Sequence, residues 1–278
     1  MLTETISCPV CAGSTLQPLL HKHGWQIVKC RSCTLAMVNP RRTNAVTIYQ
    51  NDAYFQDERY YYDYLGNKDA YQKGFRSKLK LIQRFGPKTG RLLDVGAAYG
   101  FFMEEANKFG YIPYGVELSP SAARHAGHYG EVFAGTLADY PAEPRFSVIT
   151  FIDSLEHFEE PVAGLRKAAA LLEPNGIVAV MVPNIESLFA RTLGARWHLL
   201  LPEEHLFYFT PQSIGKMLSK AGLELVHLGT GGYGRSLQEL LQVVLRGHLA
   251  AQFPGGGLLR RVSFEINLGD IFAIARKA

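Results

Sequence analysis

A chain of 278 residues has room for one large domain and a small one, and with 47% hydrophobic and 19% charged residues it can fill a globular core. No apolar run reaches the roughly 18 residues of a membrane-spanning helix, and the amino terminus lacks the features of a signal peptide, so we expect a cytoplasmic protein. The formal charge of +4 resides in residues 1–48, and a nucleic-acid channel would need more basic side chains on the remainder.

The four cysteines form two C-x-x-C pairs, Cys8 with Cys11 and Cys30 with Cys33. Two such pairs at this spacing indicate a tetrahedral Zn²⁺ site, because each pair makes a tight turn that directs both thiolates toward one ion. Four protein ligands leave no open coordination position, so the predicted role is structural. Two disulfides or a redox pair are the alternatives. We predict a zinc-binding knuckle over residues 1–48, which either binds RNA or braces the domain that follows.

Tyrosine is concentrated in the next segment, where seven of the fourteen tyrosines lie between Tyr49 and Tyr71. The pattern predicts a helix over residues 59–85, with a break near Gly66 and an end at the Gly-Pro pair 86–87. The rings either pack this helix onto a sheet or form a lid over a ligand, in which aromatic faces would contact a cation.

Residues 91–102 read RLLDVGAAYGFF, an apolar strand that ends at Asp94, turns through Gly96 and Gly100, and opens a helix at Phe101. A strand, loop and helix in this order form a nucleotide site at the carboxyl end of a parallel strand. The G-x-x-x-G spacing matches neither the dinucleotide fingerprint nor the P-loop. Asp94 would repel a phosphate and attract a sulfonium or an α-ammonium group.

A second acid, Glu117, ends the next predicted strand 21 residues after Gly96, where an acid can grip ribose hydroxyls. Together with the loop, it resembles motif I and the second-strand acid of class I S-adenosylmethionine (SAM) methyltransferases, over roughly residues 75–230. The match departs from the family at Ala97 and at Ala98, where the family usually has glycine, so we expect a slightly shifted loop. The resemblance implies a Rossmann-like α/β fold with a seven-stranded sheet in the order 3-2-1-4-5-7-6.

The same resemblance implies which residues bind SAM. An aromatic pair before motif I is matched by Tyr54-Phe55, and the loop after the third strand is where adenine usually rests. The implied cofactor-binding residues are Tyr54, Asp94, Gly96, Ala98, Gly100, Phe101, Glu117, Leu118, Thr136, Leu137 and Asp153.

Further strands are predicted at 131–134, 146–152, 177–182, 223–228 and 269–275, with helices that begin at Ser119-Pro120 and Thr210-Pro211. The last two strands usually form a short hairpin, but residues 229–268 separate them here. Within a methyltransferase domain spanning 49–278, we predict a helical insertion at about 231–268. It would cover the acceptor site or make a homodimer contact.

Two histidines are candidate general bases, because imidazole titrates near neutral pH. His157 lies in a stretch, Asp153 to Pro161, that resembles the family's segment after strand four. His205 lies in a His-Leu…Phe-Thr-Pro segment that resembles the same family. For each, a structural role in hydrogen bonding or packing is the alternative.

The run from Cys30 to Arg41 resembles the leader of a bacterial group in which a zinc-binding segment precedes a SAM domain. That resemblance implies SN2 methyl transfer to a small molecule, such as the hydroxyl or carbon of a sugar, nucleotide-sugar, glycolipid or natural product. A zinc-bearing rRNA or tRNA methyltransferase is disfavoured by the weak charge and the missing Asn-Pro-Pro-Tyr motif. A non-catalytic scaffold with this fold is the third interpretation.

Overall fold

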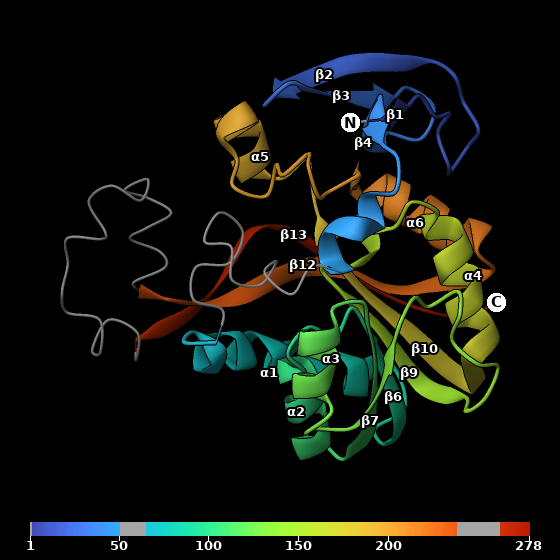
Figure 1. The fold of residues 1–278 in the computed structure, drawn as a ribbon, viewed down its shortest axis with the longest axis vertical. Helices are drawn as coiled ribbons and strands as arrows, with labels where there is room; N and C mark the ends of the chain where they lie inside the picture. The colour runs from blue at the N-terminus through green and yellow to red at the C-terminus, as the bar shows by residue number, and fades with distance from the viewer. Residues whose placement is uncertain (1, 51–64, 238–261) are drawn as a thin grey trace.

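The computed structural model describes residues 2–50, 65–237 and 262–278 (Figure 1). At its centre lies a seven-stranded sheet in the order β12-β13-β10-β9-β6-β7-β8, which is the predicted order read from the opposite edge. Five strands run parallel: β6 (Gly90–Val95), β7 (Tyr111–Glu117), β8 (Glu131–Ala134), β9 (Phe146–Ile152) and β10 (Leu172–Pro183). The fold is therefore the predicted Rossmann-like α/β architecture with a mostly parallel sheet.

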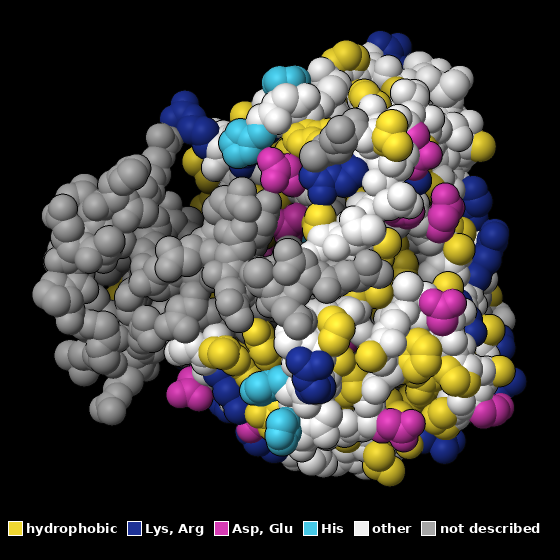
Figure 2. All heavy atoms as spheres, viewed as in Figure 1, with side chains coloured by type: hydrophobic (Ala, Val, Ile, Leu, Met, Phe, Trp, Pro, Cys, Tyr) yellow, Lys and Arg dark blue, Asp and Glu magenta, His cyan; other side chains and the backbone are white. Residues whose placement is uncertain are grey.

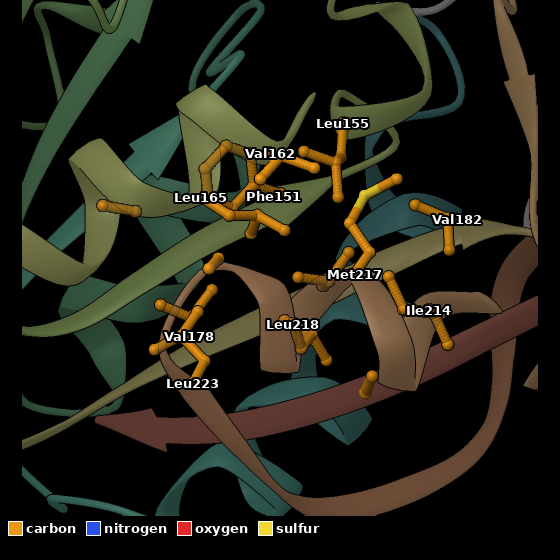
Figure 3. Close-up of a cluster of buried hydrophobic side chains, with 14 of the residues drawn as sticks. Phe151, Leu155, Val162, Leu165, Val178, Val182, Ile214, Met217, Leu218 and Leu223 are labelled. Carbon is orange, nitrogen blue, oxygen red and sulfur yellow. The ribbon is translucent and has the colours of Figure 1, made fainter. Parts of the chain in front are cut away.

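Helices cover both faces of this sheet (Figure 1). Successive residues of a strand point to opposite faces, so Leu92 packs with helices α1 (Lys68–Phe85) and α2 (Phe101–Lys108), whereas Leu93 packs with α4 (Pro161–Leu171) and α6 (Pro211–Lys220). Figure 3 shows the second of these clusters, in which side chains from α4 and α6 meet those of β9 and β10. Since both faces are buried, the parallel strands read as continuous apolar runs.

The helix starts follow the predicted caps. The Ser119 side chain accepts a hydrogen bond from Ala122 N at the start of α3 (Pro120–Ala126), and Thr210 forms a capping box with Ser213 at the start of α6. The helix predicted over 59–85 is observed as α1, which begins at Lys68 after a turn at residues 65–67. Residues 59–64 lie outside the described part of the chain.

The two antiparallel strands at the other edge are longer than predicted. β12 spans Leu223–Ser236 and β13 spans Ser263–Lys277, and their register runs out to the pair Ser236 and Ser263. The helical insertion predicted from residue 231 is therefore wrong at both of its ends, which are paired strands. Strand β12 lies against α1, where a Cβ on Gly234 would collide with the Ala70 carbonyl. Residues 238–261 of the predicted insertion lie outside the described residues.

The amino-terminal segment forms a small sheet of its own, with β2 (Leu16–Lys22), β3 (Trp25–Cys30) and β4 (Ala36–Val38). Its fourth strand is β11 (Phe207–Tyr208), which comes from the long excursion after β10 and pairs with β4. Two short strands, β1 (Thr3–Glu4) and β5 (Arg41–Arg42), form a separate antiparallel sheet beside it. The excursion also contains α5 (Leu188–Leu193) and the 3-10 helix η4 (Gly194–Arg196).

Among the described residues, no helix is long and apolar enough to span a membrane.

Candidate cofactor and acceptor site

The loop between β6 and α2 is shaped by residues with positive φ. Gly96 has φ 83°, and a Cβ there would lie 2.7 Å from the Ser154 Cβ, so only glycine fits without a shift. Ala98 has φ 49°, which is the left-handed region in which the family usually has glycine. Gly100, with φ 78°, is the N-cap of α2. The loop therefore turns through three left-handed positions, one of which is occupied by an alanine.

Glu117, at the end of β7, is buried and binds backbone N–H groups on both sides. Its Oε2 accepts from Ala98 N at 2.7 Å, and its Oε1 accepts from Ser119 N at 2.8 Å. Burial raises the pKa of this carboxyl group, and the backbone hydrogen bonds oppose that shift. Glu117 thus joins the loop after β6 to the loop after β7. It also lines the larger of the two cavities described below.

Asp94, at the end of β6, is 3% exposed and accepts a hydrogen bond from Thr150 Oγ1 at 2.7 Å. Burial raises its pKa to about 7, and the bond from Thr150 only partly opposes this. The neutral form of this carboxyl group is therefore favoured up to a higher pH than is usual for an aspartate. A cation beside it would favour the ionised form.

Two cavities open at the carboxyl edge of the parallel strands, the edge at which α/β proteins bind ligands. The larger has a volume of about 420 Å³, and the smaller has a volume of about 160 Å³. Both are lined by Gly96, Ala98, Asp153 and His157, so they meet at these residues. Two ligands, one in each cavity, would therefore touch each other at this boundary.

Most of the predicted cofactor residues line these cavities. The larger is lined by Gly96, Ala98, Glu117, Leu118, Thr136, Leu137 and Asp153, and the smaller is lined by Asp94. Gly100 and Phe101 line neither; Phe101 is 1% exposed and packs in the core beside α1. Tyr54 lies outside the described residues.

The structure brings the two candidate bases together. The ring centroids of His157 and His205 are 4.8 Å apart. His157 Nδ1 lies 2.6 Å from the Tyr49 hydroxyl and 3.1 Å from the Glu204 carbonyl oxygen. Desolvation lowers the pKa of His157 to about 4 and lowers the pKa of His205 well below its usual value. Both rings are therefore neutral at pH 7, the form that a base requires.

Residues that the sequence analysis did not single out complete the smaller cavity. They are Glu156 on the 3-10 helix η3 (Leu155–His157), Glu204 before β11, Arg235 on β12 and Asp270 on β13. Asp270 directly precedes the apolar run 271–275 of β13, which is the one local signal that could have found it. The other three are recognised only once η3, β11 and β12 have been placed beside one another.

The four cysteines converge at the tip of the amino-terminal sheet. The Cys8 and Cys33 sulfurs are 3.2 Å apart, and those of Cys11 and Cys30 are 3.4 Å apart, with all four thiols free. The four sulfur atoms lie within 4.8 Å of one another. Three of them are buried although the segment has little core of its own. A thiol-rich set of this kind suits a soft, tetrahedral metal ion.

The amino-terminal sheet also holds the walls of the smaller cavity. Val38 N donates to the Leu206 carbonyl, and Leu206 N donates to the Glu156 carbonyl. Arg41 Nη1 donates to the Glu159 carbonyl at 2.7 Å. The segments that carry Glu156 and His205 are therefore fixed to each other through a residue that is bonded to β4.

Comparisons with known proteins agree with this architecture. A family model described as a methyltransferase domain matches residues 70–228. Ubiquinone biosynthesis O-methyltransferases of Ralstonia nicotianae and Thiobacillus denitrificans are each 29% identical, over 168 and 169 residues. Each alignment covers 54% of this chain, and they cover 70% and 72% of those relatives.

Two solved structures share the fold at low sequence identity. Magnesium protoporphyrin IX methyltransferase from Synechocystis, with bound S-adenosylhomocysteine (SAH), has a TM-score of 0.56 at 15% identity, over 84% of this chain and 97% of that one. A Burkholderia thailandensis 1,6-didemethyltoxoflavin N1-methyltransferase, with bound substrate and SAH, has a TM-score of 0.57 at 16% identity, over 94% of this chain and 99% of that one.

Proposed function

Because the chain belongs to the methyltransferase-domain family and is a SAM-dependent methyltransferase, we propose that it methylates a hydroxyl or carbon of a small molecule. The observation that carries this proposal is the meeting of the two cavities at Asp153 and His157. A methyl donor in the larger cavity would present its methyl group to an acceptor in the smaller one.

The larger cavity suits the adenosine part of the donor. Glu117 offers carboxylate lone pairs to ribose hydroxyls, and Leu118, Leu137 and Thr136 supply an apolar cleft with a polar edge for adenine. Asp94 and Asp153 lie on the side toward the smaller cavity, where they would face the cationic methionine end. When bound, the donor supplies a methyl group that the sulfonium has already activated for displacement.

The residues of this chain would contribute mainly through positioning. Holding donor and acceptor in line can be worth roughly 7–11 kcal/mol of the barrier. His157 lines both cavities, so a neutral imidazole there can take the proton of an acceptor hydroxyl as the new bond forms. The Tyr49 hydroxyl and the Glu204 carbonyl, which both contact Nδ1, would orient the ring.

Two observations support a small acceptor rather than RNA. The smaller cavity is confined, at about 160 Å³, and has aromatic residues such as Tyr71, Phe75 and Tyr233 in its lining. On the face shown in Figure 2, Lys and Arg alternate with Asp and Glu, and the described residues form no continuous basic stripe there.

The names of the curated relatives support oxygen as the methylated atom. A sugar or natural-product hydroxyl is our proposal for the acceptor class.

We further propose that the four cysteines hold a structural Zn²⁺ ion. With four thiolates as ligands, the ion would have no open position for catalysis. Its role would be to stabilise a segment whose strand β4 supports β11 and, through Leu206, the wall of the acceptor cavity.

Co-crystallisation with SAH, together with a methyl-transfer assay using labelled SAM, tests this function. We expect SAH in the larger cavity with its sulfur near Asp153 and His157, and label on small hydroxylated acceptors but not on rRNA or tRNA. Submicromolar RNA binding that weakens steeply with salt would contradict the small-molecule proposal.

A further inference from the structure

Asp270, on β13, is a buried carboxylate that lines the smaller cavity. It is 2% exposed, and neither of its carboxyl oxygens has a hydrogen-bond partner among the described residues. The residues opposite it in the sheet cannot supply one, because neither Gly231 on β12 nor Pro183 on β10 carries a polar side chain. Buried carboxylates are normally hydrogen-bonded, so a ligand in the cavity can supply the missing donor.

Asp270 lacks hydrogen bonds, but it does not lack positive charge. Arg235 and Lys78 both interact with it electrostatically, and they oppose the rise in its pKa that burial causes. Lys78 donates instead to the Gly232 carbonyl and to Glu265 Oε1, the latter at 3.1 Å, so it compensates the charge of Asp270 without a bond to it. A neutral donor such as a hydroxyl group therefore suits Asp270 better than a third cation would.

The space beside Asp270 depends on a glycine. A Cβ on Gly231 would lie 3.0 Å from the Asp270 Cβ and 2.9 Å from the Met181 sulfur, so any side chain at position 231 would crowd the carboxyl group. The lining of the same cavity includes the aromatic rings of Tyr71 on α1 and Tyr233 on β12. Aromatic walls with one buried acceptor suit a ring compound that carries a hydroxyl group on its edge.

Asp270 is remote from both the methionine end of the donor and the point of methyl transfer. In the order β13-β10-β9-β6, β13 is three strands away from β6 and Asp94, which at the usual strand spacing is about 14 Å. It is two strands away from β9, which Asp153 follows, and that separation is about 10 Å. A hydroxyl group bound to Asp270 therefore lies at the far end of the acceptor from the oxygen that receives the methyl group.

We propose that Asp270 is a specificity-determining residue that binds a second hydroxyl group of the acceptor, remote from the hydroxyl that is methylated. The acceptor class narrows accordingly to ring compounds with hydroxyl groups at two ends. A site with a buried acceptor discriminates strongly against an analogue that lacks the hydroxyl, because the carboxyl oxygens then stay unpaired. This role rests on the proposed function, because it treats the smaller cavity as the acceptor's.

The test uses the full chain saturated with SAH and two pairs of probes, hydroquinone with phenol and biphenyl-4,4′-diol with biphenyl-4-ol. Within each pair, the diol has one additional hydroxyl group at the far end of the molecule. In at least one pair, we expect the diol to bind about 10-fold or more tightly than its mono-ol by calorimetry. In Asp270→Leu, which has no acceptor oxygen, this preference should fall below about threefold, with the affinity for the mono-ol within about threefold of the unmodified chain.

Asp270→Asn, which keeps one acceptor oxygen, is the second variant in case Asp270→Leu does not fold, and it should reduce the preference at least about threefold. The control is Glu224→Gln, which removes a carboxylate from an exposed pair with Arg276 and should leave the preference unchanged.

The proposal is overturned if neither diol is preferred to its mono-ol, or if the preference persists in the Asp270 variants. Equal losses for diol and mono-ol would overturn it as well, because they would show a general effect on the cavity. SAH binding is measured in the same calorimeter. Failure to bind SAH would contradict the proposed function, whereas a missing preference with SAH bound would contradict only the role of Asp270.

Discussion

The carboxylate of Glu117 accepts a hydrogen bond from the backbone N–H of Ala98, with 2.7 Å between Oε2 and the nitrogen. This bond joins the end of β7 to the loop after β6, and it holds Ala98 in the left-handed region, with φ 49°. A non-glycine residue in that region costs roughly 1–2 kcal/mol. The bond to a buried carboxylate offsets this cost, so the loop keeps the turn that glycine would give.

Substitutions at Ala98 test how much strain the loop holds. Ala98→Gly removes the steric cost and adds freedom to the unfolded chain, so we expect the free energy of unfolding to change by less than about 1 kcal/mol. SAH affinity should stay within about threefold. Ala98→Val, whose β-branched side chain resists positive φ, should lower the free energy of unfolding by about 1–3 kcal/mol. Urea unfolding and calorimetry measure both quantities, and equal effects of the two substitutions would contradict the strain argument.

Glu117→Gln tests the ribose contact and the bridge between the two turns. The amide NH₂ would face a backbone N–H that now finds a carboxylate oxygen, so one buried donor is left unsatisfied. We expect SAH affinity to fall about 10- to 100-fold, equivalent to about 1.4–2.8 kcal/mol. The control is Glu131→Gln, at an exposed position on the neighbouring strand β8. Comparable losses in both variants would show that the effect is not specific to the site.

Asp94 should couple donor binding to pH. Its folded pKa is raised from 3.8 to about 7, so between about pH 4 and pH 7 the folded chain holds a proton that the unfolded chain has lost. Its contribution to stability is therefore greatest below pH 4 and decreases as the pH rises to about 7. A cationic donor favours the ionised carboxylate, so SAM binding at pH 6 should release a proton. Calorimetry in two buffers of different ionisation enthalpy measures that release.

Variants at Asp94 separate charge from packing. Asp94→Asn should abolish the release of a proton and weaken SAM binding, and Asp94→Ala should abolish SAM binding. The Thr150 hydroxyl, which donates to Asp94, remains in both variants and can still bond to the Leu93 carbonyl. Unchanged proton release in Asp94→Asn would assign the linkage to another group, and Asp270, whose pKa burial also raises to about 7, would be examined next.

The parallel strands and the loop acids were accessible from the sequence because each is encoded locally, whereas the order of the strands was implied by the resemblance to class I methyltransferases. Both faces of β6 and β9 are buried, so their residues read as apolar runs, and Asp94 and Asp153 end these runs. The caps at Ser119 and Thr210 are likewise local signals. Residues such as Gly96 and Glu117 could therefore be assigned to the cofactor site without any knowledge of tertiary contacts, and both line the larger cavity.

The acceptor cavity was less accessible because its residues come together only through long-range packing. Glu156, Glu204 and Asp270 belong to three separate elements, and no spacing in the chain relates them. The pairing of β4 with β11 is also non-local, as is the lengthening of β12 and β13. In β12, Gly234 lets the strand approach α1 closely, because a Cβ at this position would collide with the Ala70 carbonyl.

His157 should act in turnover and not in donor binding. We expect His157→Ala to lower kcat by about 10²- to 10⁴-fold with SAH affinity within threefold, because general base catalysis is worth that much. Since the folded pKa is about 4, the ring stays neutral down to that pH, and the base function should be lost only as the pH falls through about 4. Full turnover in the variant would remove His157 from the mechanism.

Tyr49 should position that imidazole. Its hydroxyl is 2.6 Å from His157 Nδ1, so Tyr49→Phe should lower kcat by about three- to tenfold without changing KM for SAM. The double variant Tyr49→Phe with His157→Ala should be no slower than His157→Ala alone, because the hydroxyl acts through the ring. Additive losses in the double variant would instead give Tyr49 an independent role.

Removing metal from the cysteine cluster should affect the acceptor side more than the donor side. In our proposal the metal stabilises the sheet in which β4 pairs with β11. Leu206 joins that sheet to Glu156, whereas Glu117 and the β6 loop lie on other strands. Cys30→Ser, or treatment with a chelator, should therefore release about one equivalent of zinc and reduce kcat at least 10-fold, with SAH affinity within threefold. The matched control is Ser32→Ala, an exposed substitution between two of the cysteines. Metal analysis, calorimetry and the transfer assay are done on the same samples. Loss of zinc with full turnover would show that the cluster is not needed to hold the wall of the acceptor cavity. Loss of SAH binding in parallel with turnover would indicate general unfolding.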